Sequence, residues 1–164
     1  MVPKVYPVAG PWPGQLFVSS RPRGGDWLKD EVAGWRNYGI DILISLLTEE
    51  EERELDLVDE ASEAQKHGLA FVSYPIPDRG VPSNTSTMFG LLERIHQDLQ
   101  QGKKVLVHCR QGIGRAGLIA TSLLVLDGVD PTVAMEEVSN ARGVHVPETT
   151  VQENCIHEIA ATVR

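Results

Sequence analysis

The 164-residue sequence has few cysteines, no excess of basic residues and no long hydrophobic run. Its two cysteines, Cys109 and Cys155, lie far apart and form neither a CxxC pair nor a zinc-ligand pattern, so we expect no structural disulfide and no metal site. We expect Cys155 to be a small buried hydrophobic residue. The formal net charge is −8 and no cluster of Lys and Arg is present, which argues against nucleic-acid binding. No apolar segment reaches the length needed to cross a bilayer, so we expect no membrane association.

The N-terminal segment gives no targeting signal. Residues 1–14 contain four prolines and no apolar stretch after a basic start, which differs from a signal peptide. A cytoplasmic location is therefore the default expectation. The length, together with a hydrophobic content of 41%, is that of one globular domain over residues 1–164.

Strand-like and helix-like segments alternate along the chain. Such alternation predicts an α/β fold with a central, mainly parallel, twisted sheet of four to five strands and helices on both faces. Ligands of these sheets bind beyond the carboxyl ends of the strands. Strands are expected at 16–19, 40–47, 69–74 and 103–108, and helices at 26–38, 48–67, 86–101, 118–126, from 130 onward and at 150–163.

Two further features of the sequence are interpreted as structural. The densest charge cluster is acidic and runs from Thr48 to Glu63. We interpret it as the solvated face of a helix that Thr48 and Glu51 start with a capping box. Trp27 and Trp35 lie at helical spacing, and we expect both in the core.

The most informative segment reads His108-Cys-Arg-Gln-Gly-Ile-Gly-Arg115, between a predicted buried strand and a helix that is apolar on nearly all sides. Five residues separate Cys109 from Arg115, and two of them are glycines. A loop of that length curls so that successive N–H groups form an anion nest, to which the helix N-terminus adds partial positive charge. Arg115 supplies a planar fork for two-point phosphate contact. The expected phosphate-binding residues are Arg110, Gln111, Gly112, Ile113, Gly114 and Arg115.

Cys109 and Asp78 are the candidate reacting groups. A helix N-terminus and nearby cations favour the thiolate form of a cysteine, which is the form that attacks phosphorus. Asp78 lies in a proline-containing loop after a strand, at the same edge of the sheet, where it could protonate the leaving oxygen. Alone, Asp78 also fits a turn residue, because Pro-Asp is common in turns.

The His-Cys-x5-Arg segment resembles the signature of the protein tyrosine phosphatase superfamily, and the Pro77-Asp78 loop resembles its mobile general-acid loop. The nearest resemblance is to the compact dual-specificity phosphatases, including the kinase-associated and Cdc14-like branches. It implies a cysteine-phosphatase fold, hydrolysis through a cysteinyl-phosphate, and no metal or cofactor. The implied partners are proteins or peptides phosphorylated on tyrosine, and also on serine or threonine, with phosphate-like oxyanions bound in the active site.

The resemblance also implies two supporting residues and exposes one departure. His108 would hold the loop around Cys109 by hydrogen bonding, and Gln152 resembles a water-positioning glutamine. The family usually has Ser or Thr directly after the loop arginine, whereas this chain has Ala116. A missing hydroxyl there would slow breakdown of the phosphocysteine.

Two other classes of protein stay open at this stage. A sulfurtransferase of the rhodanese type or an arsenate reductase also uses a cysteine loop that binds an oxyanion, but needs no aspartate in an upstream loop. A phosphate-binding pseudophosphatase without turnover is the second alternative, and Ala116 motivates it. Lipid phosphates are less favoured substrates, because Arg110 is the only basic residue between Cys109 and Arg115.

Overall fold

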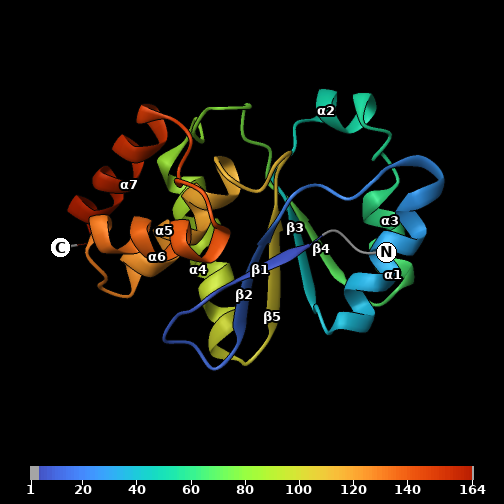
Figure 1. The fold of residues 1–164 in the computed structure, drawn as a ribbon, viewed down its shortest axis with the longest axis horizontal. Coiled ribbons are helices and arrows are strands. Elements are labelled where there is room, and N and C mark those ends of the chain that lie inside the picture. The colour runs from blue at the N-terminus through green and yellow to red at the C-terminus, as the bar shows by residue number, and fades with distance from the viewer. Residues whose placement is uncertain (1–3, 164) are drawn as a thin grey trace.

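A five-stranded sheet forms the centre of the computed structural model, which describes residues 4–163 (Figure 1). The strand order is β1-β2-β5-β3-β4. The last four of these strands run parallel to their neighbours, and β1 pairs antiparallel at one edge. This confirms the predicted α/β fold with a mainly parallel sheet. The strands are β1 Val5–Val8, β2 Gln15–Ser19, β3 Ile42–Ser45, β4 Ala70–Ser73 and β5 Lys104–His108.

Helices cover both faces of the sheet. Figure 1 shows α4, α5, α6 and α7 on one side and α1 and α3 on the other, with α2 beyond one end of the strands. Each side has its own hydrophobic core: Val105 and Val107 of β5 point into the α4–α7 side, and Leu106 points toward Trp35 of α1. The helices are α1 Leu28–Tyr38, α2 Glu49–Glu54, α3 Glu60–Lys66, α4 Thr85–Gln100, α5 Arg115–Leu126, α6 Pro131–Arg142 and α7 Thr150–Thr162, and a short 3-10 helix, Gly25–Trp27, precedes α1.

Strand β5 lies in the middle of the sheet and carries the chain to the signature loop. Its last residue, His108, lies level with Ser19 of β2 and Ser45 of β3. Because these strands are parallel, their carboxyl ends meet at one edge, and α5 returns from that edge through the core. Nearly every residue of α5 is buried, in agreement with its apolar sequence. The signature loop is therefore held between two buried elements.

Three details differ from the sequence prediction. Strand β1 lies inside the proline-containing N-terminal segment, where no strand was predicted. The acidic segment forms two helices, because the chain turns at Asp56, which has a φ of 57°. Trp27 is 56% exposed, with the guanidinium of Arg23 over its ring, so only Trp35 of the pair lies in the core.

Within residues 4–163, no helix is long and apolar enough to cross a membrane.

Candidate active site

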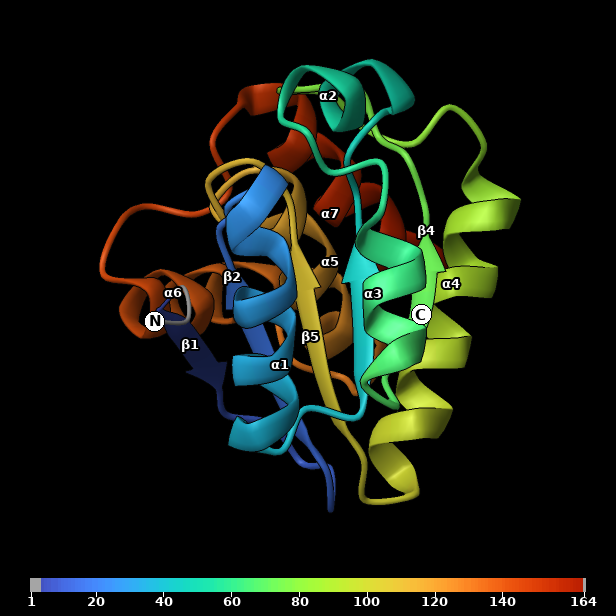
Figure 2. The same cartoon turned by 90° about the vertical axis from the view of Figure 1, so that its right-hand side faces the viewer.

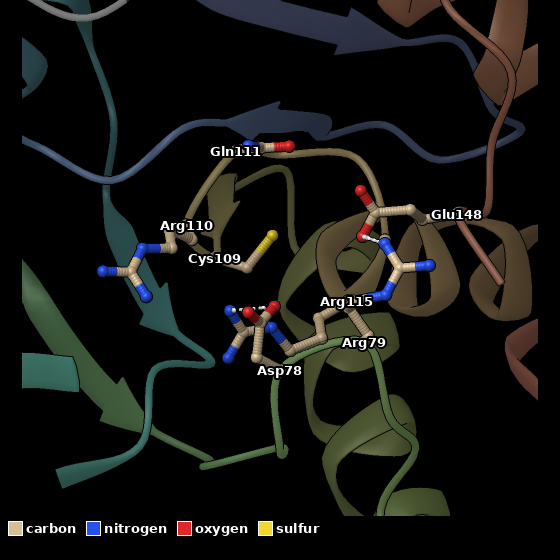
Figure 3. Close-up of a pocket in the computed structure, with 8 residues that line it drawn as sticks. Asp78, Arg79, Cys109, Arg110, Gln111, Arg115 and Glu148 are labelled. Carbon is tan, nitrogen blue, oxygen red and sulfur yellow. Dashed lines mark hydrogen bonds and ion pairs between the residues drawn. The ribbon is translucent and has the colours of Figure 1, made fainter. Parts of the chain in front are cut away.

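A pocket of about 150 Å³ opens where the loops after β4 and β5 meet (Figure 3). The thiol of Cys109 points into the space that the labelled side chains enclose, and the residue itself is only 3% exposed. The structure thus brings together Cys109, Arg115 and Asp78 from separate parts of the chain. The lining residues are Asp78, Arg79, Cys109, Arg110, Gln111, Gly114, Arg115 and Glu148.

The backbone of the signature loop directs N–H groups toward the sulfur. The N–H of Gly112 donates to Sγ of Cys109 at 3.2 Å. Gly112 has a φ of 74°, and a Cβ there would come within 2.5 Å of the backbone of Ser19. Only glycine therefore fits this point of the curl.

The carbonyl groups of the same loop are occupied by donors elsewhere in the fold. The carbonyl of Arg110 accepts from the N–H of Arg21 at 3.3 Å. The carbonyls of Gln111 and Gly112 accept from the guanidinium of Arg142 at 3.0 and 3.1 Å. Because N–H and C=O of a trans peptide point in opposite directions, such bonding leaves the N–H groups free to hold an anion.

Arg115 is almost completely buried and is held by a carboxylate beside the pocket. Its Nη1 and Nη2 donate to the two carboxylate oxygens of Glu51 at 2.6 and 2.9 Å, and Nη1 also donates to the carbonyl of Ile76 at 2.9 Å. Burial alone would lower the pKa of Arg115, but Glu51, Cys109 and Asp78 together raise it. Burial alone would raise the pKa of Glu51, but Arg115 and Thr48 hold it below its usual value. The guanidinium therefore stays charged and fixed in orientation.

Asp78 lies across the pocket from the thiol and is about half exposed. Its Oδ1 accepts from Nη2 of Arg115 at 3.2 Å, a contact drawn in Figure 3. Within residues 4–163 the Nε–H of Arg115 makes no hydrogen bond, so this donor is available to a phosphate. Nη2 already donates to both Glu51 and Asp78. A bound phosphate would take Nη2 only if Asp78 released it.

His108 lies beneath the loop and is fully buried. Its Nδ1 is 3.3 Å from the carbonyl oxygen of Cys109, and its Nε2 is 2.6 Å from a carboxylate oxygen of Glu60. Trp35 stacks on the imidazole, with ring centroids 6.0 Å apart. These contacts fix the ring against the backbone of Cys109.

The loop that carries Asp78 is attached to the start of α7. The side-chain amide of Gln152 donates to the carbonyl of Gly80 at 3.1 Å, and the hydroxyl of Thr149 donates to the carbonyl of Arg79 at 3.3 Å. Arg79 and Glu148 form an ion pair of 3.5 Å at the pocket mouth (Figure 3). Gln152 itself is buried and completes a capping box with Thr149, so in this structure its amide bonds backbone groups and does not line the pocket.

Sequence reasoning missed several residues around the pocket. Glu51 and Glu60 belong to the acidic segment that was interpreted as a solvated face, yet both are buried against the signature motif. The capping box at Thr48 was the only local signal for Glu51, and it indicates a helix start without indicating a partner. Arg142 and Glu148 carried no signal, because their contacts depend on the tertiary fold.

Ala116 is fully buried in the core side of α5, directly after Arg115. Among the described residues, no group of three or more His, Cys, Asp or Glu side chains is arranged to hold a metal ion.

Comparison with known proteins agrees with this geometry. A family model described as "Swiss Army Knife protein, DSP-PTPase phosphatase domain" matches residues 12–160. Cyclin-dependent kinase inhibitor 3 of Mus musculus is 30% identical over 124 residues, which cover 75% of this chain and 58% of that protein. The same protein of Rattus norvegicus is 32% identical over 96 residues, covering 57% and 45%. The chain thus spans about half the length of the curated relatives it matches.

Solved structures give the same fold. The crystal structure of kinase associated phosphatase, with its catalytic-site cysteine replaced by serine, superposes with a TM-score of 0.92 over 99% of this chain and 97% of that one, at 20% identity. The active form of Tk-PTP superposes with a TM-score of 0.75 over 90% and 92%, at 28% identity. The first likeness, at such low identity, shows the fold alone.

Proposed function

The chain belongs to the dual-specificity phosphatase domains of the protein tyrosine phosphatase superfamily, and on that premise we propose that it is a cysteine-dependent phosphomonoester hydrolase. The observation that carries the proposal is the convergence of Cys109, Arg115 and Asp78 on one pocket. The proposed substrates are proteins or peptides carrying phosphotyrosine, and also phosphoserine or phosphothreonine. The whole of residues 1–164 is proposed to be one catalytic domain.

In the first proposed step the thiolate of Cys109 attacks phosphorus. A sulfur–phosphorus bond forms, the bond from phosphorus to the leaving oxygen breaks, and that oxygen takes a proton from Asp78. The N–H groups of residues 110–114 and the guanidinium of Arg115 hold the three remaining phosphoryl oxygens. Their positions support this role, because the loop carbonyls are bonded elsewhere.

In the second proposed step water attacks the phosphocysteine. Asp78, now a carboxylate, accepts a proton from the water, the sulfur–phosphorus bond breaks, and inorganic phosphate leaves. His108 is proposed to keep the Cys109 backbone in place throughout. A water-positioning role for Gln152 would require its amide to leave the carbonyl of Gly80, so it stays a proposal that depends on movement of the loop.

The test is hydrolysis of an aryl phosphate by the wild type and by Cys109→Ser. The serine variant should lose turnover, because its hydroxyl stays protonated, while tungstate binding should persist, because the loop remains. Cys155→Ser is the matched control, since Cys155 lies outside this pocket and burial raises the pKa of its thiol. Appreciable turnover by Cys109→Ser would contradict the assignment of the nucleophile. Absence of turnover in a wild type that binds tungstate would favour a pseudophosphatase.

A further inference from the structure

Arg142, the last residue of α6, contacts the signature loop without lining the pocket. Its Nε donates to the carbonyl of Gly112 at 3.1 Å, and its Nη2 donates to the carbonyl of Gln111 at 3.0 Å. Within residues 4–163, Arg142 forms no ion pair with a carboxylate. Its charged donors are therefore directed at two successive carbonyls of the loop.

These two bonds fix the direction of two peptide planes in the anion nest. The peptide between Gln111 and Gly112 is held at both ends, since its oxygen accepts from Arg142 and its N–H donates to the sulfur of Cys109 at 3.2 Å. The next peptide is held through the oxygen of Gly112, so the N–H of Ile113 points away from Arg142. Without Arg142, both peptides could rotate and turn a carbonyl toward the thiol.

The guanidinium of Arg142 is itself held by the N-terminal strand. Its central carbon lies 4.1 Å from the ring centroid of Tyr6, which is a cation–π contact. Tyr6 is half-buried on β1, level with Val18 of β2, and Lys4 approaches the same ring at 5.3 Å. Figure 2 shows β1 beside α6 at the edge of the sheet. The stacked ring restricts the plane in which the guanidinium can lie.

We propose that Arg142 is a positioning residue that keeps the signature loop in its anion-binding form, and that Tyr6 acts on the loop through Arg142. The edge strand β1 is then part of the active-site support and not only the end of the sheet. The proposal rests on the proposed phosphatase function for its effect on turnover, whereas its effect on anion binding needs no turnover.

The first experiment measures tungstate affinity by calorimetry for the full chain and for Arg142→Ala and Arg142→Lys. Each lost hydrogen bond from a charged group corresponds to a roughly tenfold change in an equilibrium constant. Arg142→Ala should therefore bind tungstate with an affinity lower by about tenfold or more. Arg142→Lys should recover only part of the loss, because one ammonium cannot bond both carbonyls in plane. Arg94→Ala removes one exposed helical arginine and should change the affinity by less than about twofold, since Arg94 does not line the pocket and its charge is screened by solvent.

The second experiment follows alkylation of Cys109 by iodoacetamide against pH, in a Cys155→Ser background. Loss of the inward N–H groups should shift the alkylation profile of Arg142→Ala to higher pH. Circular dichroism checks that the variant keeps its fold. In a folded variant, a merely structural role of Arg142 would leave the profile unchanged. Normal tungstate affinity and an unshifted profile in folded Arg142→Ala would overturn the proposal. If that variant does not fold, Arg142→Lys and Tyr6→Ala decide by the same two measurements.

A double-mutant cycle tests the link to Tyr6. Tyr6→Ala should weaken tungstate binding severalfold, Tyr6→Phe should leave it unchanged because the ring remains, and Tyr6→Ala should add no further loss to Arg142→Ala. Independent, additive losses would show that Tyr6 does not act through Arg142. Wild type that binds tungstate but hydrolyses no phosphate ester would refute the proposed function and leave this inference standing.

Discussion

At the scale of single residues, the carboxylate of Asp78 occupies a place that a phosphate would need. It accepts from Nη2 of Arg115 at 3.2 Å, and Glu51 accepts from both Nη1 and Nη2 of the same guanidinium. Two carboxylates thus neutralise one buried cation in this structure. A phosphate that enters the loop must compete with Asp78 for Nη2 of Arg115. When the phosphate binds Nη2, Asp78 is free to face the leaving oxygen.

Replacement of Asp78 should therefore separate binding from turnover. Asp78→Asn should bind tungstate more tightly than the wild type, because the competing negative charge is gone. The same variant should hydrolyse phosphotyrosine about 10²- to 10⁴-fold more slowly, since general-acid catalysis is worth that much. An aryl phosphate with an activated phenol, which leaves without a proton, should be affected least. Equal losses for both substrates, or weaker tungstate binding, would contradict a general-acid position for Asp78.

The missing hydroxyl at Ala116 leads to a second prediction. In this structure the sulfur of Cys109 has a backbone donor, the N–H of Gly112, but that group also belongs to the loop that must hold phosphate. A hydrogen bond to a charged group is worth about 1.5–3 kcal/mol, or roughly tenfold or more in rate. Breakdown of the phosphocysteine should therefore be slow, and rapid mixing should show a burst of phenol equal to the enzyme concentration.

Ala116→Ser should speed the second step and shrink that burst, with little change in the first step. Ala120→Ser is the matched control, because it adds the same hydroxyl about one turn further along the buried helix. No burst in the wild type, together with unchanged turnover in Ala116→Ser, would mean that the N–H of Gly112 already suffices for the leaving sulfur.

At the scale of elements, the periodic segments of the sequence were sufficient to predict the central strands and most helices. The buried strand before Cys109 and the apolar helix after Arg115 have patterns that local burial dictates. The same reasoning missed β1, because prolines at positions 3, 7, 11 and 13 do not suit a central strand, whereas an edge strand tolerates Pro7. Edge position is a tertiary property and cannot be read from the segment alone.

The acidic segment shows a second limit of sequence reasoning. Its composition correctly indicates helix and exposure for residues such as Glu49 and Glu50, but two members, Glu51 and Glu60, turn inward toward Arg115 and His108. A carboxylate is buried only where a specific partner compensates its desolvation, and both partners lie in the signature motif about fifty residues or more away. Local pattern therefore indicated Cys109, Arg115 and Asp78 as candidate reacting residues, but it gave no signal that Glu51 and Glu60 contact the signature motif.

Glu60 joins the start of α3 to His108 at the end of β5. Glu60→Gln keeps the size of the side chain but removes the charge that His108 contacts at 2.6 Å. The free energy of unfolding should fall by about 1–3 kcal/mol, and turnover should fall as the imidazole loosens its hold on the Cys109 backbone. Asp59→Asn makes the same chemical change at the neighbouring exposed residue and should alter neither quantity. Equal behaviour of the two variants in denaturant unfolding and in turnover would contradict this role of Glu60.

At the scale of the whole molecule, a chain with a net charge of −8 contains a pocket that we propose binds an anion. The long-range field is unfavourable to a phosphorylated substrate, so the local donors of the loop and Arg115 must supply the attraction. The acidic residues are nevertheless part of the solution, because Glu51 fixes the guanidinium. The ionisation of such residues also makes the free energy of unfolding depend on pH. The adjacent Glu51 and Glu52 contribute to this dependence with opposite signs.

The adjacent Glu51 and Glu52 have pKa values that shift in opposite directions in the folded state. The pKa of Glu51 is lowered in the folded state, because the bonds from Arg115 and Thr48 outweigh burial, so its carboxylate stabilises the fold above its ordinary value of 4.5 and loses that contribution as the pH falls through its folded pKa. The pKa of Glu52 is raised by burial and by the nearby Glu60 and Glu49, so its ionised form costs stability at neutral pH. In urea unfolding at pH 7, Glu51→Gln should be less stable than the wild type and Glu52→Gln more stable. Both differences in the free energy of unfolding should shrink as the pH is lowered. The difference for Glu51→Gln should shrink only below about pH 4.5, whereas the difference for Glu52→Gln should shrink already above that pH. The two substitutions are chemically identical and adjacent, so each is the control for the other. If both change the free energy of unfolding at pH 7 in the same direction, removal of negative charge from an acidic protein governs the result, and the bonds from Arg115 do not distinguish Glu51 from Glu52.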